Sequence, residues 1–353
     1  MKNQIIKPVF KQKNIAVVFA TDTNYVPYMA VSIQSIFSHA NSEYNYDLLI
    51  FDDGISDYQK EQLSIYQTSN FSLRYIDIKP LLNNMDSSLF KARGIWSAAT
   101  FYRLFIPQIM PDYDKVLYLD CDVLVKDSLV DLFNLDLGKN CAGCVYDEIR
   151  YTGNMNRISD INKYVGIKDY KKYFNAGMIL FNIPKINPLT FAKDFMQALS
   201  RPYLPFLDQD VLNILWENKY QALDGCWNYQ YYTMIEHPDL VHNQELSKAQ
   251  KDRKIIHYIT QYKPWNSPHL PHAAEWWAEA RKTPFYEEII YKNTKTSNIL
   301  LRNLKHYNRL FGKYFTYKLL KNITFGQTRN KIETKIGGLK RQVKQVRAVY
   351  KDK

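Results

Sequence analysis

The chain is poor in cysteine and glycine and has no long apolar run. Of its 353 residues, 4 are cysteine and 12 are glycine. No stretch of about 18 apolar residues occurs, so the sequence predicts no membrane-spanning helix. Residues 1–14 form a polar N-terminal extension without the continuous apolar core of a secretory signal. We therefore expect a cytoplasmic protein.

The few cysteines argue against a disulfide framework or a zinc site. Cys141 and Cys144 have the spacing of a redox pair or of half a zinc site, but no second Cys or His pair completes a metal motif. Both are expected to pack inside a strand or the core.

Acidic residues are scarce at the C-terminal end. Residues 291–353 hold 17 Lys and Arg but only two acids, Glu333 and Asp352, whereas residues 1–290 hold 30 basic and 33 acidic side chains. The overall charge of +12 therefore belongs to this end of the chain. Residues 298–320 mix Leu, Phe and Tyr with Lys and Arg at helical spacing, which predicts an amphipathic helix on an anionic membrane surface.

Two other interpretations of this basic end stay open. It could be a solvated extension with no partner. The charge alone would also suit a non-catalytic protein that binds anionic surfaces or nucleic acid, but no nucleic-acid-binding motif accompanies it, so no nucleic-acid partner is expected.

The first two thirds of the chain alternate short apolar runs with helical stretches. The expected strands are residues 15–20, 46–51, 71–78, 115–120 and 175–182, with a helix at residues 27–37. This alternation predicts an α/β fold with a largely parallel sheet, whose ligands bind beyond the carboxyl ends of the strands. The pattern ends near residue 265, which divides the chain into residues 1–14, a main domain at 15–265 and a basic region at 266–353.

A carboxylate pair ends one of these strands. In KVLYLDCDVLV (115–125) the apolar run stops at Asp120, and Asp122 follows two residues later. That spacing in an extended chain predicts both carboxylates on one face, where hard oxygen ligands suit Mn²⁺ or Mg²⁺. A solvated strand end is the alternative.

Taken together, the motifs resemble those of the family 8 retaining glycosyltransferases, which include bacterial lipopolysaccharide and lipooligosaccharide galactosyl- and glucosyltransferases and the glycogenins. The resemblance is carried in order by FATDTNY (19–25), FYRL (101–104), VLYLDCDVLV (116–125), YFNAGMILFN (173–182), FLDQDVLN (206–213) and HYITQYKPW (257–265). It implies a GT-A fold, a Rossmann-like mixed sheet with helices on both faces, here followed by the helical basic extension.

The resemblance also implies an activity. The expected reaction moves a hexose, galactose or glucose, from a UDP-sugar to a glycan acceptor in the synthesis of lipopolysaccharide, lipooligosaccharide or another cell-surface glycan. With the basic end as an anchor, we expect the enzyme at the inner face of the cell membrane, acting on a lipid-linked glycan. A protein acceptor is the alternative within the same class.

Carried over position by position, the resemblance makes Asp120, Asp122 and His257 the ligands of Mn²⁺ or Mg²⁺. An imidazole beside two carboxylates favours Mn²⁺. Without its motif, His257 would be read as a structural histidine.

The expected donor-binding residues are Ala20, Asp22, Asn24, Tyr25, Arg103 and Lys263. Tyr25 would stack on the uracil ring, and Lys263 would meet the diphosphate as a point charge. Helix capping is the alternative for Asp22 and Asn24, and a solvated side chain is the alternative for Lys263.

The sugar is expected to contact Asp147, Asn175, Asp208 and Gln209. Gln209 occupies the position that faces the anomeric carbon, but an amide is a poor nucleophile. We therefore expect a front-side route in which a phosphate oxygen of the UDP helps to deprotonate the acceptor. The chain departs from the family at Thr260, often a glycine, and at Ile95, a histidine in some members.

Overall fold

The structure is a computed structural model that describes residues 5–82 and 98–295, with short stretches at 312–313, 316–318, 332–333, 335–336 and 338–340. The chain divides into two compact units, Met1–Ile289 and Ile290–Lys353, and the fold below is that of the first. The short stretches of the second unit are helical. Ile95 and most of residues 298–320 lie outside the described residues, so the amphipathic helix stays a prediction.

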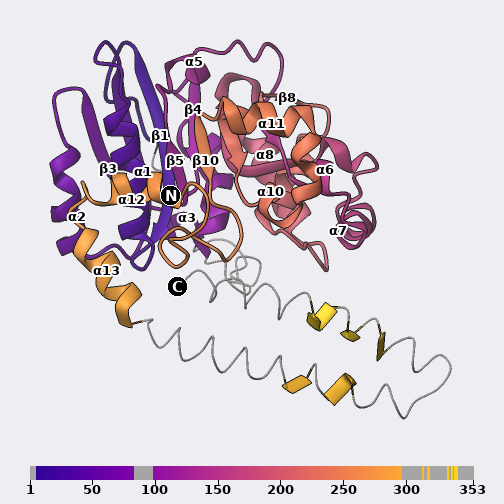
Figure 1. The fold of residues 1–353 in the computed structure, drawn as a ribbon. Helices are drawn as coiled ribbons and strands as arrows, with labels where there is room; N and C mark the ends of the chain where they lie inside the picture. Colours follow the sequence, from indigo (N-terminus) through magenta and orange to yellow (C-terminus); the bar gives the residue numbers. More distant parts are fainter. Residues whose placement is uncertain are drawn as a thin grey trace. The chain divides into compact units, whose positions relative to one another are not determined.

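A seven-stranded mixed sheet runs through the first unit (Figure 1). Four neighbouring strands, in the order β3-β2-β1-β4, are parallel, and β7 joins β4 antiparallel. β6 pairs antiparallel with β7 and parallel with β8. The strands are β1 (Asn14–Asp22), β2 (Asn45–Asp53), β3 (Phe71–Asp77), β4 (Lys115–Leu119), β6 (Ala142–Tyr146), β7 (Phe174–Asn182) and β8 (Tyr220–Ala222).

A second, three-stranded sheet supports one side of the site. It consists of β5 (Val123–Val125), β9 (Tyr229–Gln230) and β10 (Ile255–His257). β10 pairs antiparallel with β5 and parallel with β9. The chain therefore passes from the large sheet to the small one between β4 and β5.

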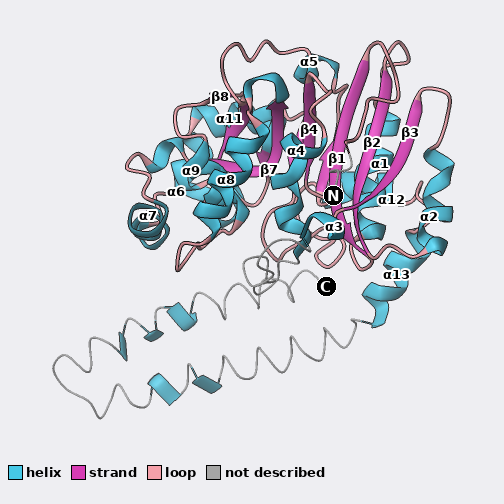
Figure 2. Ribbon diagram, turned by 180° about the vertical axis from the view of Figure 1, so that it is seen from behind, coloured by secondary structure: helices cyan, strands magenta, loops and turns pink. Residues whose placement is uncertain are grey.

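Helices cover both faces of the large sheet (Figure 2), which explains why β1 is apolar at consecutive positions. Val17 packs into one buried cluster with residues of α1 (Val26–Ser38), whereas Val18 packs into the other with residues of α9 (Asp208–Leu215). The first cluster also takes residues from α11 (Gln244–Lys251) and α12 (Ala273–Ala280), and the second from the 3-10 helix η3 (Ala98–Phe105), α4 (Ile106–Ile109) and α8 (Pro188–Leu199).

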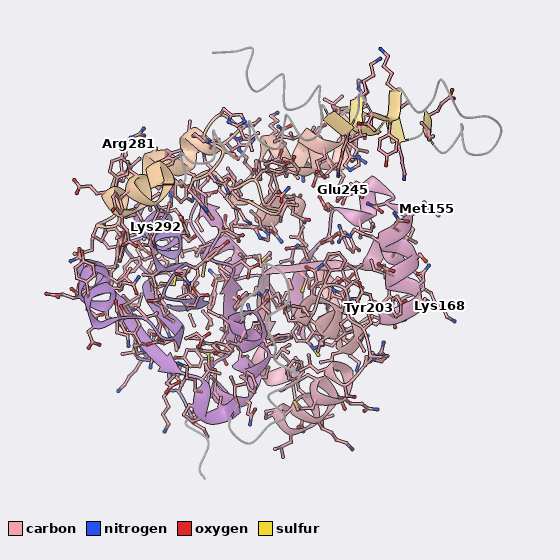
Figure 3. All side chains as sticks on the ribbon, turned by 90° about the horizontal axis from the view of Figure 1, so that it is seen from below. Met155, Lys168, Tyr203, Glu245, Arg281 and Lys292 are labelled. Carbon is pink, nitrogen blue, oxygen red and sulfur yellow. The ribbon has the colours of Figure 1, made fainter. Side chains whose placement is uncertain are left out.

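The remaining α-helices of the described residues are short and lie mostly in the connections. They are α2 (Asp57–Leu63), α3 (Lys79–Leu82), α5 (Val130–Phe133), α6 (Ile149–Thr152), α7 (Met155–Asp160), α10 (Thr233–Glu236) and α13 (Tyr286–Lys295). Met155 at the start of α7 and Tyr203 after α8 are exposed at the surface (Figure 3). Among the described residues, no helix combines the length and apolar character needed to cross a bilayer.

The predicted fold class is confirmed. Each predicted strand matches a strand of the large sheet, and the helix predicted at 27–37 is α1. The sheet is parallel only from β3 to β4 and turns antiparallel at β7. Trp276 and Phe285, beyond residue 265, are buried in the same cluster as Val17. The boundary placed near residue 265 stays a prediction.

Candidate active site

A cavity of about 380 Å³ opens beyond the carboxyl ends of β1 and β4. Of the thirteen residues that the sequence predicts for metal, donor and sugar binding, twelve line this cavity. The exception is Asn24, whose side chain is exposed. Residues more than 200 positions apart in the sequence therefore converge on one space, although their individual roles stay predictions.

The carboxylate pair sits in a turn rather than in an extended strand. β4 ends at Leu119, Cys121 and Asp122 form the turn, and β5 begins at Val123 in the other sheet. The expectation of an extended Asp-x-Asp segment was wrong, because the chain must change sheets here. The carboxylates still converge, since both face the same histidine.

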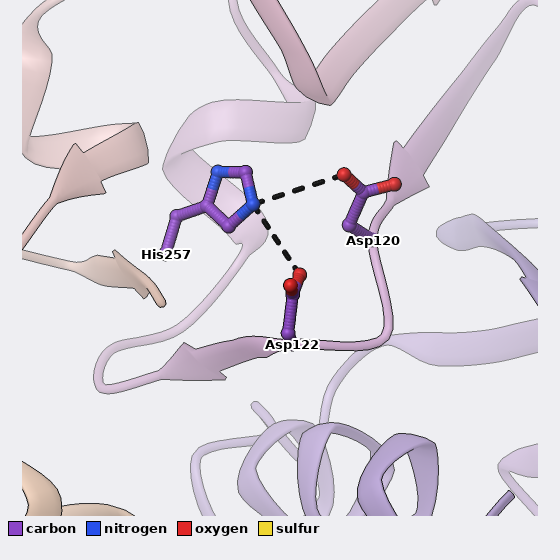
Figure 4. Close-up of side chains that lie close together, drawn as sticks. All are labelled: Asp120, Asp122 and His257. Atoms are coloured by element: carbon purple, nitrogen blue, oxygen red, sulfur yellow. Dashed lines mark ion pairs between the residues drawn. The ribbon is translucent and has the colours of Figure 1, made fainter. Parts of the chain in front are cut away.

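His257 reaches the pair from the last residue of β10 (Figure 4). The β5–β10 register places His257 opposite Val123, and Tyr258 donates its backbone N–H to the carbonyl of Asp122 at 3.0 Å. His257 Nε2 lies 3.7 Å from Asp120 Oδ2 and 3.3 Å from Asp122 Oδ1. One ligand atom from each of the three residues falls within a span of 4.8 Å.

Two observations indicate that a metal ion fits among these three side chains. Gly177 in β7 has no side chain to fill the space beside them. A Cβ at this position would lie 2.1 Å from His257 Cε1 and 2.8 Å from Asp120 Oδ2. Asp122 Oδ1, which faces His257 Nε2 at 3.3 Å, is buried without a hydrogen-bond partner among the described residues. A buried carboxylate oxygen left unpaired is costly, and a cation would compensate it. Two carboxylates and one imidazole therefore fit Mn²⁺ or Mg²⁺.

Asp122 is held as a carboxylate by basic neighbours. Lys263 Nζ lies 2.5 Å from Asp122 Oδ2 and also donates to the carbonyl of Tyr258. Burial alone would raise the pKa of Asp122, but Lys263 and His257 outweigh it and keep that pKa below its usual value. Asp122 is thus ready to bind a cation at neutral pH.

Arg103 from η3 joins Asp120 to Asp208. Its NH2 group lies 2.8 Å from Asp120 Oδ1 and its Nε 3.0 Å from Asp208 Oδ2. Tyr118 also donates to Asp120 Oδ1, and the Arg103 guanidinium stacks over the Tyr118 ring. Burial would lower the pKa of Arg103, but the two carboxylates outweigh it and raise that pKa. Burial also raises the pKa of Asp208 to about 6, against the opposing charge of Arg103.

The end of β1 supplies the expected nucleotide-binding segment. Asp22 Oδ1 accepts the backbone N–H groups of Asn24 and Tyr25, at 2.8 and 3.2 Å. Asp22 therefore organises the turn before α1 whether or not it contacts a base. The carbonyl of Ala20 accepts from the thiol of Cys121, which ties this turn to the carboxylate pair.

Three of the four expected sugar-binding residues, Asp147, Asn175 and Gln209, form one hydrogen-bonded group. Gln209 Nε2 donates to Asp147 Oδ2 at 3.2 Å, and Asn175 Nδ2 donates to the same oxygen at 3.4 Å. Gln209 Oε1 accepts the backbone N–H of Ala176 at 2.9 Å. Each side chain in this group is therefore fixed by at least one of the others.

Sequence reasoning missed Arg157, which lines the cavity, and Asn228, which contacts His257. Arg157 on α7 donates to Asp147 and Glu148, and its guanidinium stacks over Phe206. Asn228 accepts from His257 at 3.0 Å. Neither residue belongs to a motif, because each reaches the site only through the fold.

The family follows from a comparison with known proteins. The model of the glycosyl transferase family 8 matches residues 16–268, which is most of the chain and includes all thirteen predicted residues. The chain belongs to glycosyltransferase family 8. This confirms the predicted family, and with it that the protein is a glycosyltransferase.

The curated relatives of this family 8 chain include two lipopolysaccharide glycosyltransferases. It is 29% identical over 318 residues to a lipopolysaccharide 1,3-galactosyltransferase of Salmonella typhimurium, covering 86% of this chain and 90% of that protein. It is 25% identical to general stress protein A of Bacillus subtilis, over 73% of this chain and 89% of the relative. An Escherichia coli lipopolysaccharide 1,2-glucosyltransferase is 27% identical over 71% of this chain and 72% of its own length.

Solved structures confirm the GT-A fold of this family 8 enzyme. The WbbM bifunctional glycosyltransferase matches with a TM-score of 0.73 and 29% identity, over 82% of this chain and 53% of that one. The galactosyltransferase LgtC, solved with donor and acceptor sugar analogues, matches with a TM-score of 0.61 and 24% identity, over 76% of this chain and 96% of that one. The second match shows the fold alone.

Proposed function

We propose that this family 8 enzyme transfers galactose or glucose from a UDP-sugar to a cell-surface glycan, with retention of configuration and with a divalent cation, Mn²⁺ in the first instance. The observation that carries the proposal is the convergence of Asp120, Asp122 and His257 in the cavity of a family 8 fold. The galactosyl- and glucosyltransferase names of its lipopolysaccharide relatives support the hexose and the type of acceptor.

Asp120, Asp122 and His257 would hold the cation. When bound there, it would neutralise the charge that develops on the departing diphosphate. Arg103 keeps Asp120 oriented through its contact with Oδ1, so Oδ2 stays turned toward His257. Lys263 carries the positive charge nearest to Asp122 and would pass from that carboxylate to the incoming diphosphate.

The sugar would be held by Asp147, Asn175 and Gln209. Gln209 Oε1 is already engaged by the N–H of Ala176, which makes it a still poorer nucleophile than a free amide. This supports the front-side route. The bond from the anomeric carbon to the phosphate oxygen breaks, the acceptor oxygen bonds to the same face, and the acceptor proton passes to a phosphate oxygen of the leaving UDP.

Asp208 has a different task in this proposal. Its carboxylate is shared between Arg103 and the hydroxyl of Thr100, which donates at 2.6 Å. We assign it the positioning of Arg103, with sugar contact as a second role. Asp210, two residues further along α9, accepts from the hydroxyl of Tyr173 and from the backbone N–H of Phe206. It therefore stabilises the start of α9.

The basic C-terminal region would bring the enzyme to its acceptor. The 17 basic side chains of residues 291–353 suit the anionic inner face of a cell membrane. Peripheral association there would place the active site beside a lipid-linked glycan.

Release of UDP from a panel of UDP-sugars, with and without Mn²⁺, tests the function. The proposal predicts Mn²⁺-dependent turnover with UDP-galactose or UDP-glucose and its loss in Asp122→Ala. Turnover that is the same in this variant, or that survives removal of all divalent cations, would rule out the metal-dependent reaction. Analysis of the product anomer tests retention separately.

A further inference from the structure

Two residues of the cavity wall have a backbone conformation that their side chains disfavour. In the described part of the chain, positive φ outside glycine occurs at Lys13, Leu207, Asn218, Thr260 and His272. Of these, Leu207 and Thr260 line the cavity. Thr260 has a φ of 72°, and a β-branched side chain is among the least suited to this left-handed region.

The contacts on either side of Thr260 hold it in this conformation. On one side, Tyr258 is fixed to Asp122 through its backbone N–H. On the other side, Lys263 Nζ contacts Asp122 and the carbonyl of Tyr258, and the Tyr231 hydroxyl donates to the carbonyl of Tyr262. The segment from 258 to 263 is thus closed into a loop whose two ends meet at Asp122. A glycine or an asparagine would fit the turn at Thr260 with less strain.

The hydroxyl of Thr260 offers what glycine lacks. Its Oγ1 accepts the backbone N–H of Tyr262 at 3.3 Å. Within the described residues, no protein acceptor takes the hydroxyl hydrogen in return. The side chain is half-buried and lines the cavity, so the hydrogen remains available to a ligand.

The charges around the loop indicate which part of the ligand the Thr260 hydroxyl contacts. Thr260 lies three residues after His257 and three before Lys263, so the loop joins a proposed metal ligand to the basic side chain that pairs with Asp122. The ammonium group of Lys263, together with a cation held by His257 and the carboxylates, would attract the anionic diphosphate of the nucleotide sugar rather than the neutral hydroxyls of its sugar.

We propose that Thr260 is a donor-binding residue whose hydroxyl donates a hydrogen bond to the diphosphate of the nucleotide, in the same cavity wall as Lys263. The strained backbone is retained because the hydroxyl is used. This inference rests on the proposed use of a UDP-sugar and adds a contact that a glycine at this position could not make.

Calorimetric titration of UDP in the presence of Mn²⁺ tests the contact. Thr260→Val keeps the shape and the β-branch but removes the hydroxyl, and it should bind UDP about tenfold more weakly, since a hydrogen bond to a charged group is lost. Thr260→Ser keeps the hydroxyl and should stay within about threefold of the wild type. Uridine, which has no phosphate, should bind all three proteins equally.

Thermal unfolding separates this role from a structural one. Thr260→Gly should melt at or above the wild-type temperature, because relief of strain offsets the entropy that glycine adds to the unfolded chain. Asn218→Gly is the matched control, since Asn218 has a φ of 59° but does not line the cavity.

The outcomes are distinct. Equal UDP affinity in Thr260→Val and the wild type would overturn the inference, as would a melting temperature of Thr260→Gly that falls well below that of the Asn218→Gly control. A wild-type protein that does not bind UDP with Mn²⁺ would instead refute the proposed function itself.

Discussion

The imidazole of His257 and the amide of Asn228 are hydrogen-bonded through Nδ1 and Oδ1 at 3.0 Å. The Asn228 amide is oriented by its own Nδ2, which donates to Asn175 Oδ1 at 2.9 Å, so its oxygen must face the histidine. His257 therefore donates from Nδ1, which leaves Nε2 facing Asp120 and Asp122. An outer residue of this kind sets both the tautomer and the ring orientation of a metal-binding histidine.

We predict that Asn228→Ala weakens Mn²⁺ binding by about 10–100-fold, because the imidazole loses the partner that fixes its tautomer. Electron paramagnetic resonance of free Mn²⁺ during titration measures this affinity. Asn134→Ala is the control, since the exposed side chain of Asn134 donates to the hydroxyl of Tyr44 and does not line the cavity. An unchanged affinity in Asn228→Ala would show that the hydrogen bond is incidental.

Gly177→Ala should abolish metal binding while leaving the sheet intact. The added Cβ would lie 2.1 Å from His257 Cε1, so the imidazole must move away from the carboxylates. Gly143→Ala, in the neighbouring strand, is the matched control, because its Cβ would meet only the ends of the Leu137 and Leu223 side chains at 3.0 Å. Circular dichroism checks the fold, and Mn²⁺ titration reports the outcome. Full Mn²⁺ affinity in Gly177→Ala would contradict the described site.

Stability should depend on pH through Glu148. Burial, followed by the charge of Asp147, raises the pKa of Glu148 from 4.5 to about 7. Below pH 4.5 the carboxyl is neutral in both states and has no effect. Between pH 4.5 and 7 the unfolded chain ionises first, so stability falls as pH rises, by up to about 3 kcal/mol above pH 7.

Glu148→Gln removes this ionisation, and its amide oxygen can still accept from Arg157 while its NH2 group faces the hydroxyl oxygen of Thr233. Relative to the wild type, the variant should therefore be more stable at pH 8 than at pH 5. Urea unfolding of both proteins at the two pH values measures the difference. A stability difference that is the same at pH 5 and pH 8 would exclude Glu148 as the source.

The basic C-terminal region should bind anionic vesicles. Replacing Lys335, Lys340 and Lys344 by Glu should weaken binding to phosphatidylglycerol vesicles by about 100-fold or more at low salt, at about 1 kcal/mol for each lysine. The same reversal at three exposed lysines of the first unit, Lys11, Lys193 and Lys219, is the control. Equal co-sedimentation of the two triple variants with the vesicles would contradict the proposed membrane anchor.

Five of the seven strands of the large sheet could be predicted because they are runs of consecutive apolar residues, whereas β6 and the three-residue β8 were not predicted. Residues 15–20 and 175–182 are largely apolar at consecutive positions. A polar motif follows the first run, and the polar Asn175 begins the second. The short strands β5, β9 and β10 carry only two or three residues each, which is too little for a periodic signal. Their pairing, which brings His257 to the carboxylates, was not predicted, and the role of His257 came from the family resemblance alone.

The site was predictable where a motif marks it and obscure where the fold alone assembles it. Asp120 and Asp122 stand after an apolar run, but the turn between them was not expected, since two-residue spacing suits a strand as well. Arg157 lies on a helix of six residues with no distinctive spacing, and it meets Asp147 only because the chain folds back. Contacts of this kind leave no mark in a single sequence.

Anomalous X-ray scattering from crystals grown with Mn²⁺ and UDP is the decisive measurement for this metal site. We expect one strong manganese peak within bonding distance of Asp120, Asp122 and His257 and in contact with the UDP diphosphate. A nucleotide bound in the cavity with no manganese peak among these three side chains would contradict it.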